Sequence, residues 1–200
     1  ANVQSTLRIK QKQYAVNTHL HARYEDKKIQ IHELALSLPD HPARITAQGT
    51  ITGDLIKDPR LRLTGKWRSL AWPLSGETVI GSEWGSYTFS GNPEKYKLTF
   101  DAVLTGKNIP PGRWMAAGEG NRNRLKLADV HGNILDGKVA GRGTFSWKPQ
   151  ITWDFDVSGD NLNPGQQWPQ WPGRLALQAG ISGRQENGQH VTTLDLHRPN

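Results

Sequence analysis

Two pairs of side chains have the alternate spacing that places ligands on one face of a β-strand. His19 and His21 form one pair, and Asp154 and Asp156 form the other. Imidazoles bind transition metals and paired carboxylates bind divalent cations, but such sites need further ligands. The sequence shows no third ligand beside either pair, and the two aspartates alternate with aromatic residues. We therefore interpret all four as solvated strand residues, and we expect no metal site and no cofactor.

A glycine-rich segment, Gly118-Glu119-Gly120-Asn121, has the composition of a phosphate-binding loop. Such loops open a helix and carry a lysine, whereas this segment leads into a strand pattern at residues 123–127. We interpret it as a hairpin turn. No serine lies in a Gly-x-Ser-x-Gly motif and the chain has no cysteine. Because no pattern assembles a nucleophile, a base and an oxyanion hole, the sequence predicts a protein that is not an enzyme.

Composition excludes several classes of protein. The 200 residues contain 25 Lys and Arg against 18 Asp and Glu, a net charge of +7, but the basic residues are scattered and accompany no nucleic-acid-binding module. Without cysteine there is no disulfide scaffold and no thiolate zinc site. No apolar run approaches the ~20 residues of a membrane helix. The chain opens at Ala1 without an initiator Met, and we expect residues 1–200 to be one continuous β segment, an internal fragment of a longer protein.

Apolar and polar residues alternate along most of the chain, as in Leu61, Leu63 and Trp67 with basic residues and a threonine between them. This period of two is typical of antiparallel strands with one covered face. Residues 1–38 contain neither Gly nor Pro and so also allow a helix, and Ile31, Leu34 and Leu38 have helical spacing. Two strand phases with a bulge near residue 33 fit them better. The sequence therefore predicts an all-β fold.

The chain also repeats itself. The apolar positions of residues 29–52 recur in residues 125–146 at an offset of 96 and then 94 residues. Both copies end in a Gly-Thr-apolar-hydroxyl sequence, at residues 49–52 and 143–146. A degenerate repeat of this kind predicts an elongated stack of hairpin-like units.

Four segments carry a resemblance to a known family: residues 70–77, 109–111, 145–153 and 167–175. In this order and at these spacings they resemble the middle, periplasmic part of the TamB family, the inner-membrane-anchored subunits of the translocation and assembly module. The resemblance covers about residues 70–183. It includes neither the N-terminal membrane anchor nor the C-terminal conserved domain of that family.

The resemblance implies a long antiparallel-rich sheet curled into a β-taco-like trough with an apolar interior. TamB proteins belong with the AsmA-like proteins, which resemble bridge-like lipid transfer proteins. The implied function is a segment of a periplasmic conduit that shields phospholipid acyl chains between the inner and outer membranes. The implied partners are phospholipid and, for the full-length protein, the outer-membrane barrel TamA, with no nucleic acid. The implied location is the periplasm of a Gram-negative bacterium.

The residues expected to line the trough are the apolar members of the strand patterns. They are Tyr14, Val16, Leu20, Leu61, Leu63, Trp67, Phe89, Leu98, Phe100, Leu125, Leu127, Phe145, Trp153, Phe155, Leu175, Leu177 and Ile181. Alternation alone does not distinguish the wall of an open groove from a closed core, since the two have the same pattern. The loop at residues 168–172, with two Trp-Pro pairs, is a candidate plug or cap.

Two other functions fit an elongated β protein. One is a chaperone-like scaffold that offers strand edges to outer-membrane proteins or autotransporters by β-augmentation. The other is a glycan-binding module that uses exposed tryptophans. The second is disfavoured because the sequence repeats along its length without a localised aromatic platform.

Overall fold

The computed structural model describes residues 1–9, 12–107, 109–186 and 189–197. They form thirteen strands in one sheet and one short 3-10 helix, η1 (Pro164–Gln166). The strands are β1 (Asn2–Ile9), β2 (Lys12–Glu25), β3 (Lys28–Ser37), β4 (Arg44–Asp54), β5 (Asp58–Trp72), β6 (Ile80–Asn92), β7 (Lys95–Gly106), β8 (Ile109–Gly120), β9 (Arg124–Ile134), β10 (Gly137–Ser146), β11 (Thr152–Leu162), β12 (Leu175–Glu186) and β13 (Gln189–His197). The all-β prediction is confirmed.

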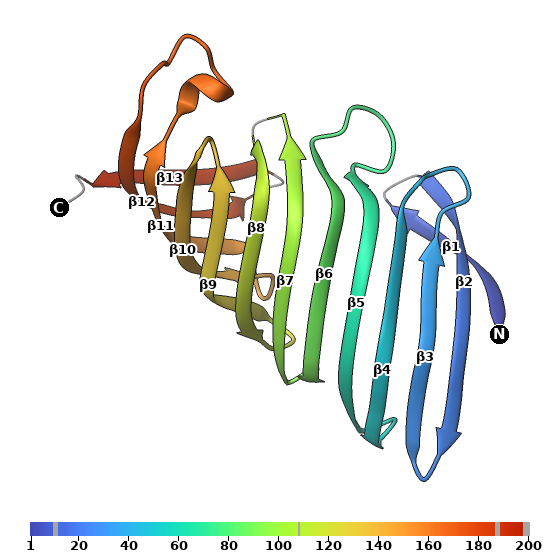
Figure 1. The fold of residues 1–200 in the computed structure, drawn as a ribbon. Coiled ribbons are helices and arrows are strands. Elements are labelled where there is room, and N and C mark those ends of the chain that lie inside the picture. The colour runs from blue at the N-terminus through green and yellow to red at the C-terminus, as the bar shows by residue number, and fades with distance from the viewer. Residues whose placement is uncertain (10–11, 108, 187–188, 198–200) are drawn as a thin grey trace.

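The sheet is an antiparallel meander in which every strand pairs with the next one in the chain. The connections therefore alternate between two long rims, an upper rim that includes the β5–β6 loop and a lower rim that includes the β4–β5 hairpin (Figure 1). The sheet is weakly curved rather than curled into a closed trough. Its twist turns the C-terminal strands away from the N-terminal ones (Figure 1).

Local turn chemistry explains the tight hairpins of the lower rim. The carboxylate of Asp54 accepts hydrogen bonds from the backbone N–H groups of Ile56 and Lys57 at 3.0 and 2.9 Å. The side-chain oxygens of Asn92 and Asn121 accept equivalent pairs of bonds from the two residues that follow their turns. Asp and Asn favour turns because their short side chains bond the backbone two and three residues on. These side chains mark the lower ends of β4, β6 and β8.

The strands at residues 28–54 show the predicted bulge. The register between β3 and β4 shifts between Ile31 and Leu34, so Leu34 returns to the same face as Ile31. One extra residue in β3 thus accounts for the spacing that also resembled a helix. The predicted turn at Gly118–Asn121 is only partly right, because Gly118 and Gly120 lie in β8 and the turn begins at Asn121.

The sheet has one layer. Among the described residues, every substantial contact between strands is between neighbours in the chain. Buried apolar residues are therefore few, and six of the ten among the described residues are alanines. The one cluster of buried residues consists of Ile134, Val139 and Leu162, near the upper ends of β9 to β11. The described sheet thus has no second sheet or helix over its apolar side.

Two long loops of the upper rim reach back across the sheet, and we call them the first strap (residues 73–79) and the second strap (residues 163–174). The Ser75 hydroxyl lies 3.0 Å from the Tyr14 hydroxyl of β2. In the second strap, the Gln166 side-chain amide donates to Asp136 in the β9–β10 hairpin at 2.9 Å. Trp171 remains 65% exposed, so the second strap does not bury it as a plug.

The two straps occupy equivalent places in the repeat. Trp72-Pro73 precedes the first strap and Trp168-Pro169 lies in the second, an offset of 96 residues. Because the straps follow β5 and β11, this offset spans six strands. The repeat detected in the sequence is therefore a six-strand unit with a Trp-Pro loop on the upper rim.

Candidate functional site

Residues paired across antiparallel strands point to the same side of the sheet, so the register assigns every side chain to a face. We call the side that carries Leu63 the apolar face and the opposite side the polar face. One cross-strand row of the apolar face, in order from β5 to β13, is Leu63, Phe89, Leu98, Gly118, Leu127, Gly143, Phe155, Ile181 and Leu194. The row crosses nine strands without a charged residue.

All seventeen residues predicted to line a trough lie on this face. Thirteen of the fourteen in β5 to β12 occupy four parallel rows of the register, and Leu175 lies in a fifth row, where it pairs with Leu162. Tyr14, Val16 and Leu20 lie at its N-terminal end, where Leu20 pairs with Leu34 of β3. Phe145 and Leu175 are the more open members, at 38% and 39% exposure. The structure shows a shared face, and whether a lipid occupies it stays a prediction.

Three aromatic residues that β6 to β8 place on the apolar face are absent from the sequence-based set: Tyr87, Tyr96 and Trp114. Tyr87 pairs with Phe100, and Trp114 pairs with Ala102. The tyrosines continue the alternation of Phe89 and Leu98 and were detectable by spacing. Trp114 was not, because alanines and glycines surround it and give no apolar pattern.

Aromatic rings on the apolar face lie over glycines of the neighbouring strand. A Cβ atom added to Gly85 would stand 2.1 Å from the Trp67 ring, and one added to Gly120 would stand 2.3 Å from the Tyr96 ring. The same arrangement joins Gly65 to Tyr87, Gly132 to Trp114, Gly143 to Phe155 and Gly183 to Trp153. The absent glycine side chains leave room for the rings to lie against the sheet. The apolar face is therefore broad and low rather than ridged.

The apolar face offers little that reacts or titrates. Burial raises the pKa of the Tyr87 and Tyr96 hydroxyls, which keeps both neutral at physiological pH. The Trp67 indole N–H donates to the Ser82 hydroxyl at 2.8 Å and is satisfied within the protein. Such a surface binds by covering apolar area and has no built-in acid, base or nucleophile.

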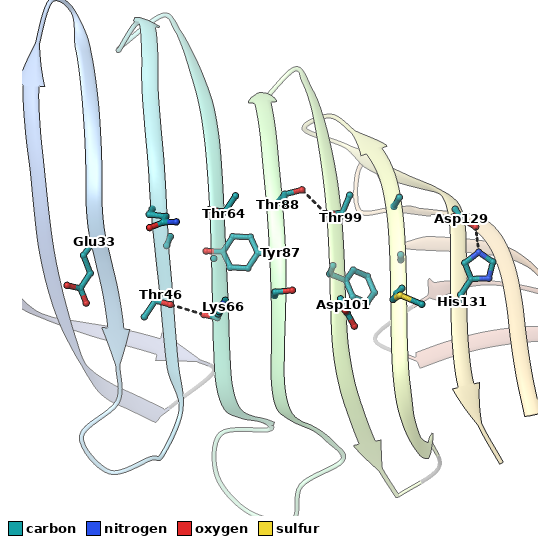
Figure 2. Close-up of a pocket in the computed structure, with 18 of the residues that line it drawn as sticks. Glu33, Thr46, Thr64, Lys66, Tyr87, Thr88, Thr99, Asp101, Asp129 and His131 are labelled. Atoms are coloured by element: carbon teal, nitrogen blue, oxygen red, sulfur yellow. Dashed lines mark hydrogen bonds and ion pairs between the residues drawn. The ribbon is translucent and has the colours of Figure 1, made fainter. Parts of the chain in front are cut away.

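A hollow of about 680 Å³ lies over the middle of the sheet and is lined mostly by polar-face side chains of β3 to β9 (Figure 2). The Thr88 and Thr99 hydroxyls are 2.6 Å apart, and His131 is 2.6 Å from Asp129. Both members of the His131–Asp129 pair are more than half exposed. The hollow thus offers hydroxyl, carboxylate and imidazole groups that form hydrogen bonds.

The four candidate ligands found in the sequence lie on exposed strand positions. The Nδ1 atom of His19 is 2.6 Å from the side-chain oxygen of Asn2, and the ring of His21 lies 4.9 Å from that of His32. Asp156 receives an N–H bond from Arg142 at 3.3 Å. The described residues contain no group of three His, Asp or Glu side chains arranged to hold a metal ion.

Fold and face together define the class of protein: a single-layer antiparallel β-sheet with a continuous apolar face along its length. The family model for the TamB N-terminal domain matches residues 55–197. The match spans most of the chain, and the chain belongs to the TamB family. No solved structure matches the chain.

Family membership associates the chain with the translocation and assembly module or with lipid transport in general. The TamB family is a transport and assembly component, anchored in the inner membrane and located in the periplasm, and partnership with TamA is its general context. Within the described residues, no helix has both the length and the apolar character to cross a bilayer.

Proposed function

We propose that the chain is a segment of a hydrophobic conduit that carries phospholipid acyl chains through the periplasm on the apolar face. The observation that supports this most directly is the unbroken apolar row from Leu63 in β5 to Leu194 in β13. Thirteen strands spaced ~4.8 Å apart give a surface ~58 Å long. The apolar face thus has the dimensions of a track rather than of a pocket.

Covering the tails is the main energetic requirement of such transport. Each CH₂ group exposed to water costs about 0.8 kcal/mol, so two long acyl chains cost tens of kcal/mol if they cross the periplasm uncovered. A continuous apolar surface removes this barrier without chemistry. Since the rings lie low over glycines such as Gly85 and Gly120, the face has no deep recess that would trap one lipid.

The test places one charge on either face of the same strand. Phe100→Arg puts a guanidinium on the apolar face, and Thr99→Arg puts the same group on the polar face one residue away. We expect Phe100→Arg to abolish lipid transfer by the full-length protein and Thr99→Arg to leave it unchanged. Circular dichroism and thermal unfolding of both variants separate lost transfer from lost folding. Full transfer by a folded Phe100→Arg variant would contradict the conduit.

A second candidate function is a scaffold that pairs with strands of client outer-membrane proteins. It is favoured by β13, the last strand of the described sheet, where Leu194 and Leu196 are 58% and 71% exposed. The β13 segment from Val191 to His197 has neither Lys nor Pro, residues that commonly protect sheet edges. Site-specific crosslinking distinguishes the two functions, since a scaffold crosslinks to client polypeptide at β13 and a conduit crosslinks to lipid at Phe100.

A further inference from the structure

The basic side chains are not scattered in the folded protein. Three upward strands open with a basic–apolar–basic–leucine sequence, at residues 60–63, 95–98 and 124–127. The middle apolar residue of each points to the apolar face, so both basic residues point to the polar face beside the lower rim. We call the resulting set the basic stripe: Lys28, Arg60, Arg62, Lys95, Lys97, Arg124 and Lys126.

The register shows how regular the basic stripe is. One continuous polar-face row from β3 to β9 reads Gln30, Thr50, Arg62, Ser90, Lys97, Glu119 and Lys126. Arg62, Lys97 and Lys126 therefore recur on every second strand, at intervals of ~10 Å. None of these three cations has an ion-pair partner among the described residues, and the row contains one carboxylate, Glu119.

A shallow hollow lies within the basic stripe. It is lined by Lys28, Arg60, Arg62 and Lys95 together with the hydroxyls of Thr50 and Ser90. The Thr52 hydroxyl and the Asn92 amide also lie there, but they donate to the Arg60 carbonyl and to Asp58. One carboxylate, Asp58, lies 3.7 Å from Arg60. Cations combined with neutral hydrogen-bond donors are the groups that bind phosphate oxygens.

The basic stripe follows the rim that the straps leave open. Both straps occupy the upper rim, whereas the described lower connections are short and begin strands with Lys28, Lys95 or Arg124 (Figure 1). In Arg60-Leu61-Arg62, two polar-face cations flank a leucine of the outermost apolar row. Long basic side chains reach around an edge while their stems stay on apolar surface.

We infer that the basic stripe holds the phosphate-bearing headgroups of anionic phospholipids at the lower rim while their tails lie on the apolar face. This inference rests on the proposed function and adds a headgroup preference and a side of entry to it. A headgroup at the lower rim stays in water, and each nearby cation attracts it electrostatically. The upper rim also carries polar-face cations, but two of them are paired: Arg113 bonds to Asp101, and Arg44 lies 3.7 Å from Glu33.

The test compares two triple variants of the 200-residue chain. The stripe variant is Arg62→Gln, Lys97→Gln and Lys126→Gln. The matched control is Lys66→Gln, Arg68→Gln and Lys138→Gln, which removes the same charge from the polar face outside the stripe. Each protein is incubated with phosphatidylcholine vesicles with and without phosphatidylglycerol, separated from them, and analysed by mass spectrometry for bound lipid. Circular dichroism checks that all three proteins are folded.

We expect the stripe variant to lose its preference for phosphatidylglycerol about fivefold, the equivalent of ~1 kcal/mol, while total bound lipid and the control variant stay unchanged. An equal loss in both variants, or no loss in either, overturns the inference and leaves the conduit standing. Absence of bound lipid from the unmodified chain overturns the conduit itself. The stripe variant could instead lose binding of soluble glycerol phosphate or of polyglutamate while its lipid preference stays unchanged. That result assigns the basic stripe to another anion and also overturns the inference.

Discussion

Replacement of Gly85 by alanine tests whether rings must lie against the sheet. The added Cβ would stand 2.1 Å from Cζ2 and 2.3 Å from Cε2 of Trp67, so the indole must leave the surface. Overpacking of this kind costs about 1–3 kcal/mol. Displacing the indole also breaks its 2.8 Å bond to Ser82, which costs about 1 kcal/mol. Alanine recovers about 0.5–1 kcal/mol over glycine in a strand. We therefore expect a net loss of about 2 kcal/mol.

The matched control is Gly180→Ala in β12. There the nearest atoms to an added Cβ are Asp195 Cβ and His197 Nε2, both 3.9 Å away, so the methyl group has room. This variant is expected to be as stable as the unmodified chain or about 0.5 kcal/mol more stable. Urea unfolding followed by circular dichroism measures both, and the Trp67 indole N–H resonance reports the local change. Equal stability of Gly85→Ala and Gly180→Ala would refute the ring-over-glycine account.

Three further predictions concern other parts of the sheet. Two hydrogen bonds from Arg113, at 2.8 and 2.5 Å, hold the pKa of Asp101 below its ordinary value. The ionised Asp101 therefore stabilises the folded protein fully above pH ~4, and this stabilisation is lost as the pH falls through the lowered pKa. Arg113→Gln should raise the pKa of Asp101 in a carboxyl NMR titration, and an unchanged titration would exclude the pair as the cause. Leu162 is only 5% exposed, so Leu162→Ala should lower the free energy of unfolding by about 2–4 kcal/mol in thermal or urea unfolding. The control Leu162→Met should lower it by less than ~1.5 kcal/mol. Similar losses in the two variants would argue against tight packing at this residue. Tyr14→Phe removes the hydroxyl next to Ser75, and hydrogen exchange in the first strap should accelerate with a global loss of at most ~1 kcal/mol; unchanged exchange would mean that the contact does not hold the strap.

Strand content and face assignment were accessible from the sequence because both depend on local periodicity. The alternation at residues 61–67 predicts a strand and the face of each residue, and the register agrees. The bulge between Ile31 and Leu34 was also predicted, since one inserted residue returns Leu34 to the apolar face. The sequence did not predict that Trp114 lies on the apolar face, because its alanine and glycine neighbours give no alternating pattern.

The sequence alone determined that the chain is an all-β repeat with one apolar side, because period and spacing are properties of the chain itself. Tertiary structure decided three things that alternation leaves open. The first is that the strands pair only with chain neighbours, so no second layer covers the described apolar face. The second is that rings such as Trp67 pair with glycines such as Gly85 across strands. The third is that Arg62, Lys97 and Lys126, which are far apart in the sequence, form one row. Each depends on register between strands, and register is set by pairing and bulges rather than by local pattern.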